Sequence, residues 1–233
     1  MTPKNVTSQE IDERLRAAGS ALPPAPATGE IKETVASTLR PVRPLPSARR
    51  LALHFFAVYV CAALAGGWAL GMYGLRALSP VQRIVIFSAS ACAAGFAAIA
   101  SAREMRPAGG RRLAGAALAL AAFGFVFVFA ALFHDYALRQ FVRQGIPCLT
   151  AGLVFAVPAA LAVSLVFRRG FALNLAAAGL AAGTVAGLAG LGALELHCPN
   201  LNAMHVMVWH VAVVVLSGLA GMLIGWFATR LRG

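Results

Sequence analysis

The sequence has few charged residues for its length, and this scarcity excludes an ordinary water-soluble globular protein. Only 12% of the 233 residues are charged, whereas 60% are hydrophobic, and the mean hydropathy is +0.77. Runs of about 20 apolar residues are long enough to cross a bilayer as helices. Six such runs are present, at roughly Leu51–Leu75, Ile84–Ala102, Leu113–Phe133, Cys148–Phe167, Phe171–Leu194 and Val206–Ala228. We therefore predict an all-α polytopic membrane protein, in which a compact bundle of six transmembrane helices (51–233) follows a soluble N-terminal tail (1–50).

The apolar segments also lack the residues on which transport and catalysis usually depend. The ionisable side chains within the predicted helices are His54 and His210, each near a helix end. Proton pumps and ion-coupled transporters usually keep carboxylates or basic groups at mid-membrane. The chain has no phosphate-binding glycine loop, CxxC pair, HExxH helix or GxSxG elbow. These absences argue against a transporter, and we predict that the protein is not an enzyme.

The net charge of +12 would suggest a nucleic-acid ligand in a soluble protein, but here its distribution indicates membrane topology. With the tail placed in the cytoplasm, 16 of the 20 Lys and Arg residues fall on the cytoplasmic side. The opposite side holds the other 4, and its last loop has none. This bias predicts that both termini are cytoplasmic, and we expect no direct binding of nucleic acid.

The tail contains a short amphipathic pattern at Glu30–Arg40. Ile31, Val35 and Leu39 recur at i, i+4 and i+8 and would share one helical face. So narrow an apolar stripe is marginal as an isolated helix in water, which is typical of segments that fold into the groove of a partner. A helix on the membrane surface, or no helix, are the alternatives. Three prolines in segment 41–46 predict a stiff, extended connector to the first transmembrane helix.

Small residues recur on two of the predicted helices, where they allow close packing in lipid. The repeats are Gly179, Gly183 and Gly187 on the fifth helix and Ser217, Gly221 and Gly225 on the sixth. We expect these two helices to pack tightly. Pro158 predicts a kink in the fourth helix. Cys61 and Cys92 fall near mid-bilayer and are expected to be small apolar packing residues.

Reactive residues gather on the side opposite to the termini, around segment 195–200. Cys198 lies in the fifth loop beside His197, and Cys148 is placed at the start of the fourth helix on the same side. A thiol in an accessible loop can ionise, and a helix N-terminus lowers the pKa of a thiol. The two outer thiols therefore have the chemistry of a metal-binding or redox-active pair.

Several chemistries are open to this pair. The thiols can close a disulfide, share a soft metal ion, be modified separately, or form a structural staple between two loops. His197 and His205 are candidates to complete a coordination shell with Cys148 and Cys198, although the spacing matches no standard zinc motif. No cofactor is predicted beyond a transiently bound soft metal ion. Interfacial hydrogen bonding is the expected role of His54, His134 and His210.

Three motifs in this order give the chain a resemblance to a known family. They are Leu-Arg-Pro-Val-Arg-Pro-Leu-Pro at 39–46, Gly-Ile-Pro-Cys at 145–148, and Leu-His-Cys-Pro at 196–199 with Val208-Trp209. In these motifs the sequence resembles the NrsF family (negative regulator of sigma F), which are six-helix anti-sigma factors of the bacterial inner membrane. The resemblance covers roughly residues 30–233, and residues 1–29 look like an extension.

The resemblance implies that the cytoplasmic tail holds an extracytoplasmic-function sigma factor inactive, with the docking segment at about 30–40. It also implies that Cys148 and Cys198, on the periplasmic side, are needed to respond to heavy metal or oxidative stress. The expected partners are the sigma factor and the lipid bilayer, and a monomer is the default. Two hypotheses of other classes remain, a membrane thiol redox protein passing electrons between these cysteines and a small metal or solute transporter.

Overall fold

The computed structural model describes residues 45–106, 112–170 and 172–231, with isolated positions of the tail at 9, 12–14, 16–17, 33 and 37–38. By its contacts the chain divides into residues 1–44 and residues 45–233, and the second unit is a helical bundle. The predicted docking residues Ile31, Val35 and Leu39 lie outside the described residues. The following description therefore concerns the bundle.

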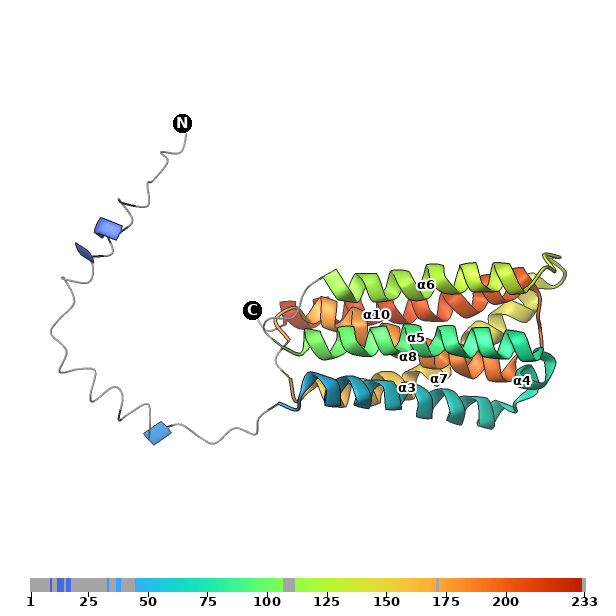
Figure 1. The fold of residues 1–233 in the computed structure, drawn as a ribbon, viewed down its shortest axis with the longest axis horizontal. Helices are drawn as coiled ribbons and strands as arrows, with labels where there is room; N and C mark the ends of the chain where they lie inside the picture. Colours follow the sequence, from blue (N-terminus) through green and yellow to red (C-terminus); the bar gives the residue numbers. More distant parts are fainter. Residues whose placement is uncertain are drawn as a thin grey trace, which may run out of the picture. The chain divides into compact units, whose positions relative to one another are not determined.

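Six helices in the bundle are long and apolar enough to cross a membrane, which confirms the predicted multi-pass membrane protein. No strand occurs in the part of the chain that the structure describes. The long helices lie side by side (Figure 1) and are α3 (Ala48–Leu70), α5 (Pro80–Glu104), α6 (Arg112–Leu132), α7 (Phe141–Phe167), α8 (Leu175–His197) and α10 (Val211–Arg230). Three short elements complete the bundle: α4 (Tyr73–Ala77), α9 (Ala203–His205) and the π-helix η1 (Val206–His210), of which the last two lead directly into α10.

Side chains at the start of several helices satisfy backbone N–H groups that have no partner within the helix. Ser47 accepts a hydrogen bond from the N–H of Arg50 at the start of α3. Ser79 and Gln82 form a reciprocal capping box at the start of α5, where Pro80 occupies the first helical position. Asn174 caps α8. The helix starts therefore follow from local sequence as well as from hydropathy.

Helix α8 is the central element of the bundle. It packs against all five other long helices. Of the residues in its most apolar stretch, 67% are buried inside the bundle, compared with 22% to 44% in the other five helices. Every residue from Gly183 to Leu196 is buried, on all sides of the helix. This stretch contains mostly Gly, Ala and Leu, so it fits among five neighbours without a lipid-facing side.

The predicted close packing of α8 against α10 is confirmed. A Cβ atom added at Gly179 or Gly183 would collide with the backbone carbonyl oxygen of Gly221 or Ser217, respectively. One at Gly187 would lie 2.6 Å from the Cα atom of Val214. The two backbones therefore meet directly, as small residues at every fourth position allow.

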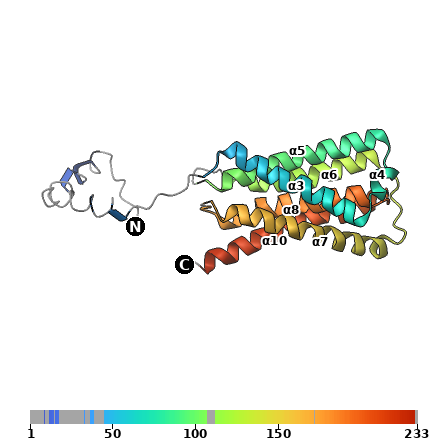
Figure 2. The ribbon, with the colours of Figure 1, turned by 90° about the horizontal axis from the view of Figure 1, so that it is seen from below.

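Six crossings bring the chain back to the end of the bundle at which it entered. We call this the near end; it holds the start of α3 and the end of α10. The far end holds α4 and the loops at 133–140 and 198–202, and both views show α4 opposite to the end of α10 (Figures 1 and 2). The length of the helices thus separates the start of α3, to which the tail is attached, from the far-end loops.

Several helix boundaries differ from those predicted, and two of these differences change the description of the far end. The first helix ends at Leu70 rather than Leu75, because Gly71 has φ 89°, a left-handed conformation that interrupts the helix before α4. The fourth helix begins at Phe141 rather than Cys148 and passes continuously through Pro147 and Pro158. An apolar run indicates where a helix crosses the membrane, but a helix can continue into the polar boundary beyond that run.

Cys61 and Cys92 do not have the predicted packing role. Both side chains are exposed on the outside of the bundle and have free thiols. The reason is that the apolar composition of a lipid-facing surface and that of a helix–helix contact are alike, so hydropathy does not separate them.

We predict that Gly183→Ala destabilises the bundle by about 1–3 kcal/mol, the usual cost of overpacking, because its methyl group has no room beside the Ser217 carbonyl. Thermal unfolding of the detergent-purified protein measures this effect. Gly95→Ala is the matched control: nothing lies within 4 Å of its Cβ position, and Ala favours a helix over Gly by about 1 kcal/mol. A melting temperature for Gly183→Ala equal to that of Gly95→Ala would contradict the described contact.

Candidate thiol and metal centre

Four side chains meet at the far end of the bundle: Cys148, Cys198, His205 and His210. Each offers one sulfur or nitrogen atom, and these four atoms all lie within 4.8 Å of one another. They come from three segments of the chain, namely α7, the residue that ends α8, and the α9–η1 segment before α10. We refer to these four residues as the far-end centre.

Glycine contacts hold α7 in the position that places Cys148 at this centre. One turn after Cys148, Gly152 lies against α8 so closely that a Cβ at Gly190 would collide with the Gly152 carbonyl oxygen. One turn before it, Gly145 lies under the indole ring of Trp209, where no Cβ would fit. The Gly-Ile-Pro-Cys motif therefore includes a glycine whose lack of a side chain allows α7 to approach η1.

The end of α8 is fixed by its own backbone and by α4. Cys198 is the residue at the helix end, and its N–H donates to the Leu194 carbonyl at 2.7 Å. Gly74 of α4 packs against the backbone of Glu195 and Cys198, with its Cβ position only 2.7 Å from both carbonyl oxygens. These contacts leave the Cys198 thiol half-buried and directed into the bundle end.

The π-helix η1 brings two histidines to the same centre. In a regular α-helix, His205 and His210 would point about 140° apart, because five residues exceed one turn of 3.6. The i→i+5 bonding of a π-helix widens the turn, so residues five apart come closer to one face. Their rings lie with centroids 5.3 Å apart in an edge-to-face arrangement.

Glu195 orients His210. Its Oε1 accepts a hydrogen bond from the Nδ1–H of His210 at 2.6 Å, and the two side chains are 4% and 1% exposed. The other ring nitrogen of His210, Nε2, lies 3.2 Å from the Cys148 sulfur. A carboxylate behind a histidine in this way is the usual support of a metal-ligating imidazole.

His205 pairs with the second thiol. Its Nε2 atom lies 3.6 Å from the Cys198 sulfur, and its side chain is buried. Its Nδ1 atom is buried without a hydrogen-bond partner among the described residues. A hydrogen bond from the Cys148 thiol, with others from His205 and His210, lowers the pKa of the Cys198 thiol, although burial opposes this effect. The environment therefore favours the thiolate at Cys198, the form that binds metals and reacts with oxidants.

Two sequence-based predictions about this site are wrong in detail. Cys148 lies seven residues after the start of α7, about two turns inside it, so the helix N-terminus does not act on its thiol. Cys198, which we predicted to lie in an accessible loop, is half-buried directly after the end of α8, and Cys148 is only 9% exposed. Cys148 lies inside the helix because α7 extends back to Phe141, whose ring packs on Trp209 with ring centroids 5.2 Å apart.

The structure gathers Cys148, Cys198 and His205 as predicted residues of one site, but His197 is not among the four. The Nδ1 atom of His197 bonds to the Gly71 carbonyl at 3.0 Å, and its ring packs on Tyr73. His210 takes the fourth position. The sequence analysis assigned His210 an interfacial hydrogen-bonding role, as it did His54 and His134; α-helical geometry would direct His210 away from His205, and the π-helix brings the two together.

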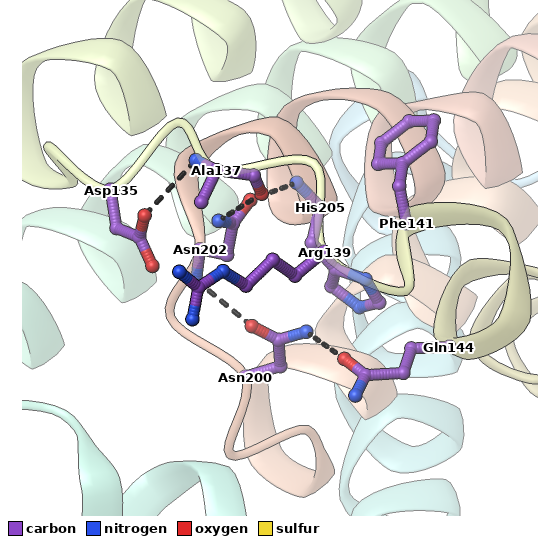
Figure 3. Close-up of a pocket in the computed structure, with 8 residues that line it drawn as sticks. All are labelled: Asp135, Ala137, Arg139, Phe141, Gln144, Asn200, Asn202 and His205. Atoms are coloured by element: carbon purple, nitrogen blue, oxygen red, sulfur yellow. Dashed lines mark hydrogen bonds between the residues drawn. The ribbon is translucent and has the colours of Figure 1, made fainter.

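A polar cavity of about 180 Å³ adjoins the far-end centre at His205 (Figure 3). Its walls come from the two far-end loops, the start of α7 and α9. Hydrogen bonds from the Asn202 side chain to the Ala137 carbonyl (2.8 Å) and from the Ala203 N–H to the Asp135 carbonyl (2.7 Å) join the two loops. The lining residues are Asp135, Ala137, Arg139, Phe141, Gln144, Asn200, Asn202 and His205. The cavity provides a polar approach to an otherwise buried group of ligands.

Comparison with known protein families identifies the family of the chain. Residues 35–231 match the family described as NrsF, negative regulator of sigma F. No curated protein and no solved structure matched the chain. The match spans the whole bundle and the end of the tail, and it confirms the resemblance seen in the sequence motifs. The chain therefore belongs to the NrsF family, the negative regulators of sigma F, and is a multi-pass membrane anti-sigma factor.

Proposed function

We propose that the protein sequesters an extracytoplasmic-function sigma factor through its tail and releases it when Cys148 and Cys198 react with heavy metal or oxidant. Family membership supports a sigma factor as partner. The meeting of both cysteines with two histidines at the far end is the observation that carries the sensing part. The proposal assigns the protein a regulatory and no catalytic role.

The proposed location is the bacterial inner membrane, with both termini cytoplasmic and the far end periplasmic. The distribution of Lys and Arg supports this orientation, because cytoplasmic loops carry the excess of positive charge. Six crossings put the attachment of the tail and the end of α10 on one side. The far-end centre then faces the compartment in which extracellular metals arrive and disulfides form.

The proposed docking segment is residues 30–40, with Ile31, Val35 and Leu39 inserted into a groove of the sigma factor. A segment that gains helical structure on binding can be released by a small loss of affinity, because ordering it already costs free energy. Division of the chain at Pro44 supports a tail that acts as a separate unit. We propose that the bundle acts as a monomer.

Helix α8 is the proposed route between the two ends. It ends at His197, directly before Cys198, begins near the membrane face where the tail is attached, and packs against every other long helix. Metal binding or disulfide formation at the far end would shift α7 against α8, and close backbone contacts transmit such a shift. A coupling free energy of 1–3 kcal/mol would change the affinity for the sigma factor by about 5- to 150-fold.

We predict that the Cys148→Ser, Cys198→Ser double variant still represses its sigma factor but no longer responds to heavy metal or oxidant. A transcriptional reporter for the sigma factor in living cells measures both properties. Cys61→Ser, Cys92→Ser is the matched control, because these thiols are exposed on the outside of the bundle. An inducer response retained by the first variant would refute the sensing role of the far-end thiols.

We predict that Ile31→Asp combined with Val35→Asp reduces co-purification of the sigma factor by at least about tenfold, the loss expected when anchoring apolar contacts are removed. Mass spectrometry of proteins retained by the tagged, detergent-purified chain measures this loss. Glu33→Ala, in the same segment but off the apolar face, is the control. Equal retention by all variants would exclude the proposed docking face, and absence of any sigma factor with the unmodified chain would favour a thiol redox protein.

A further inference from the structure

We propose that the far-end centre binds a single Zn²⁺-type divalent ion through Cys148, Cys198, His205 and His210, with Glu195 as the positioning residue for His210. This deepens the proposed function, and it rests on that function only for its regulatory consequence. Disulfide formation between the two cysteines would not require the two histidines or the carboxylate that positions one of them.

The distances between the ligand atoms fit four-coordination. Zinc–sulfur bonds of about 2.3 Å and zinc–nitrogen bonds of about 2.0 Å place sulfur and nitrogen about 3.5 Å apart around a tetrahedral ion. The Cys148–His210 and Cys198–His205 pairs are separated by 3.2 Å and 3.6 Å. Since no pair exceeds 4.8 Å, side-chain movements of about 1 Å would close the shell around an ion.

The supporting contacts also fit a metal site. The Glu195 carboxylate accepts a hydrogen bond from Nδ1 of His210, so Nε2 is the ring atom that faces the thiols and that would coordinate an ion. His205 is 3% exposed, and its Nδ1 atom has no hydrogen-bond partner in the described part of the chain, which is costly for a group that serves only to pack. Both histidines are thus positioned to bind an ion: the carboxylate orients His210, and His205 lies between Cys198 and the cavity.

The charge balance favours a divalent ion. Two thiolates and two neutral imidazoles around an M²⁺ ion sum to zero, so the filled shell itself is neutral and the Glu195 carboxylate is the charge that remains beside it. Binding forms two metal–sulfur and two metal–nitrogen bonds, and any proton still on a thiol passes to water; no electrons are transferred. Thiolate and imidazole ligands in a tetrahedral arrangement select zinc-like ions over magnesium or calcium.

An ion in this position would join three separate segments at one point. Cys148 anchors α7, Cys198 anchors the end of α8, and the histidines anchor α9 and η1, which continue into α10. Binding of the ion would therefore change how these helices pack, and in this way exposure of the protein to metal would affect α8.

The test is metal binding by the full-length protein, purified in detergent, reduced and stripped with a chelator. Zn²⁺ stoichiometry is measured by elemental analysis, and affinity by competition with a chromophoric chelator. We expect one ion per chain, and the Co²⁺-substituted protein should show the intense visible spectrum of a tetrahedral site with thiolate charge transfer. A chain that binds no Zn²⁺ in excess of a Cys148→Ser, Cys198→Ser variant would overturn the proposal.

Variants separate the four ligands from their neighbours. His210→Ala should lose stoichiometric binding, and Glu195→Gln should keep one ion but bind it about 10- to 100-fold more weakly, as for other residues that support a ligand. His197→Ala and His134→Ala are controls that should bind as the unmodified chain does. Loss of binding in His197→Ala with normal binding in His210→Ala would overturn the assignment; if His210→Ala is not monodisperse, the near-isosteric Glu195→Gln decides.

Failure of this proposal differs from failure of the proposed function. If the purified chain binds no ion, while the double cysteine variant loses its inducer response in cells, sensing by the thiols stands and the metal centre does not. If the chain binds one ion through all four ligands, while the same variant responds normally, the metal centre stands and the sensing role does not.

Discussion

The direct contact of helix backbones around α8 is the constraint on which the rest of the bundle depends. In lipid no hydrophobic effect drives helices together, so close packing and small side chains must hold them. Gly179, Gly183 and Gly187 let α10 approach, and Gly190 does the same for α7. The same approach aligns the end of α8 with Cys148 and with η1. The far-end centre therefore results from packing along the whole helix and not only from its loops.

In this arrangement the reactive side chains and the attachment of the tail lie at opposite ends of the bundle. Reactive side chains lie at the end where three segments converge, whereas the tail is attached where α3 begins. A central helix that touches all others provides a physical connection between the two, since a buried, tightly packed element shifts as a unit. Under the proposed function, the protein would sense on one side of the membrane and act on the other.

Much of this fold could be predicted from the sequence, because apolar runs and small-residue repeats report directly on membrane crossing and helix contact. The positions of Cys148, Cys198 and His205 at one side followed from counting the crossings. The role of His210 did not, because a π-helix changes which residues share a face and has no simple signal in the sequence. The predicted fifth helix ends at Leu194 and leaves Glu195 outside it, yet Glu195 belongs to the final turn of α8 and supports His210.

The central claim is that the far-end centre controls the affinity of the tail for its sigma factor. The most direct measurement uses the protein reconstituted in vesicles, with its far end facing either the inside or the outside. The sigma factor that co-purifies with the protein is bound to the tail on the opposite side of the membrane. Zn²⁺, Cd²⁺ or a peroxide is then added to the far-end side alone, and dissociation of the sigma factor is followed. Our account predicts a change in its dissociation constant of about 5- to 150-fold. An unchanged dissociation constant, with the centre shown to be modified, would contradict it.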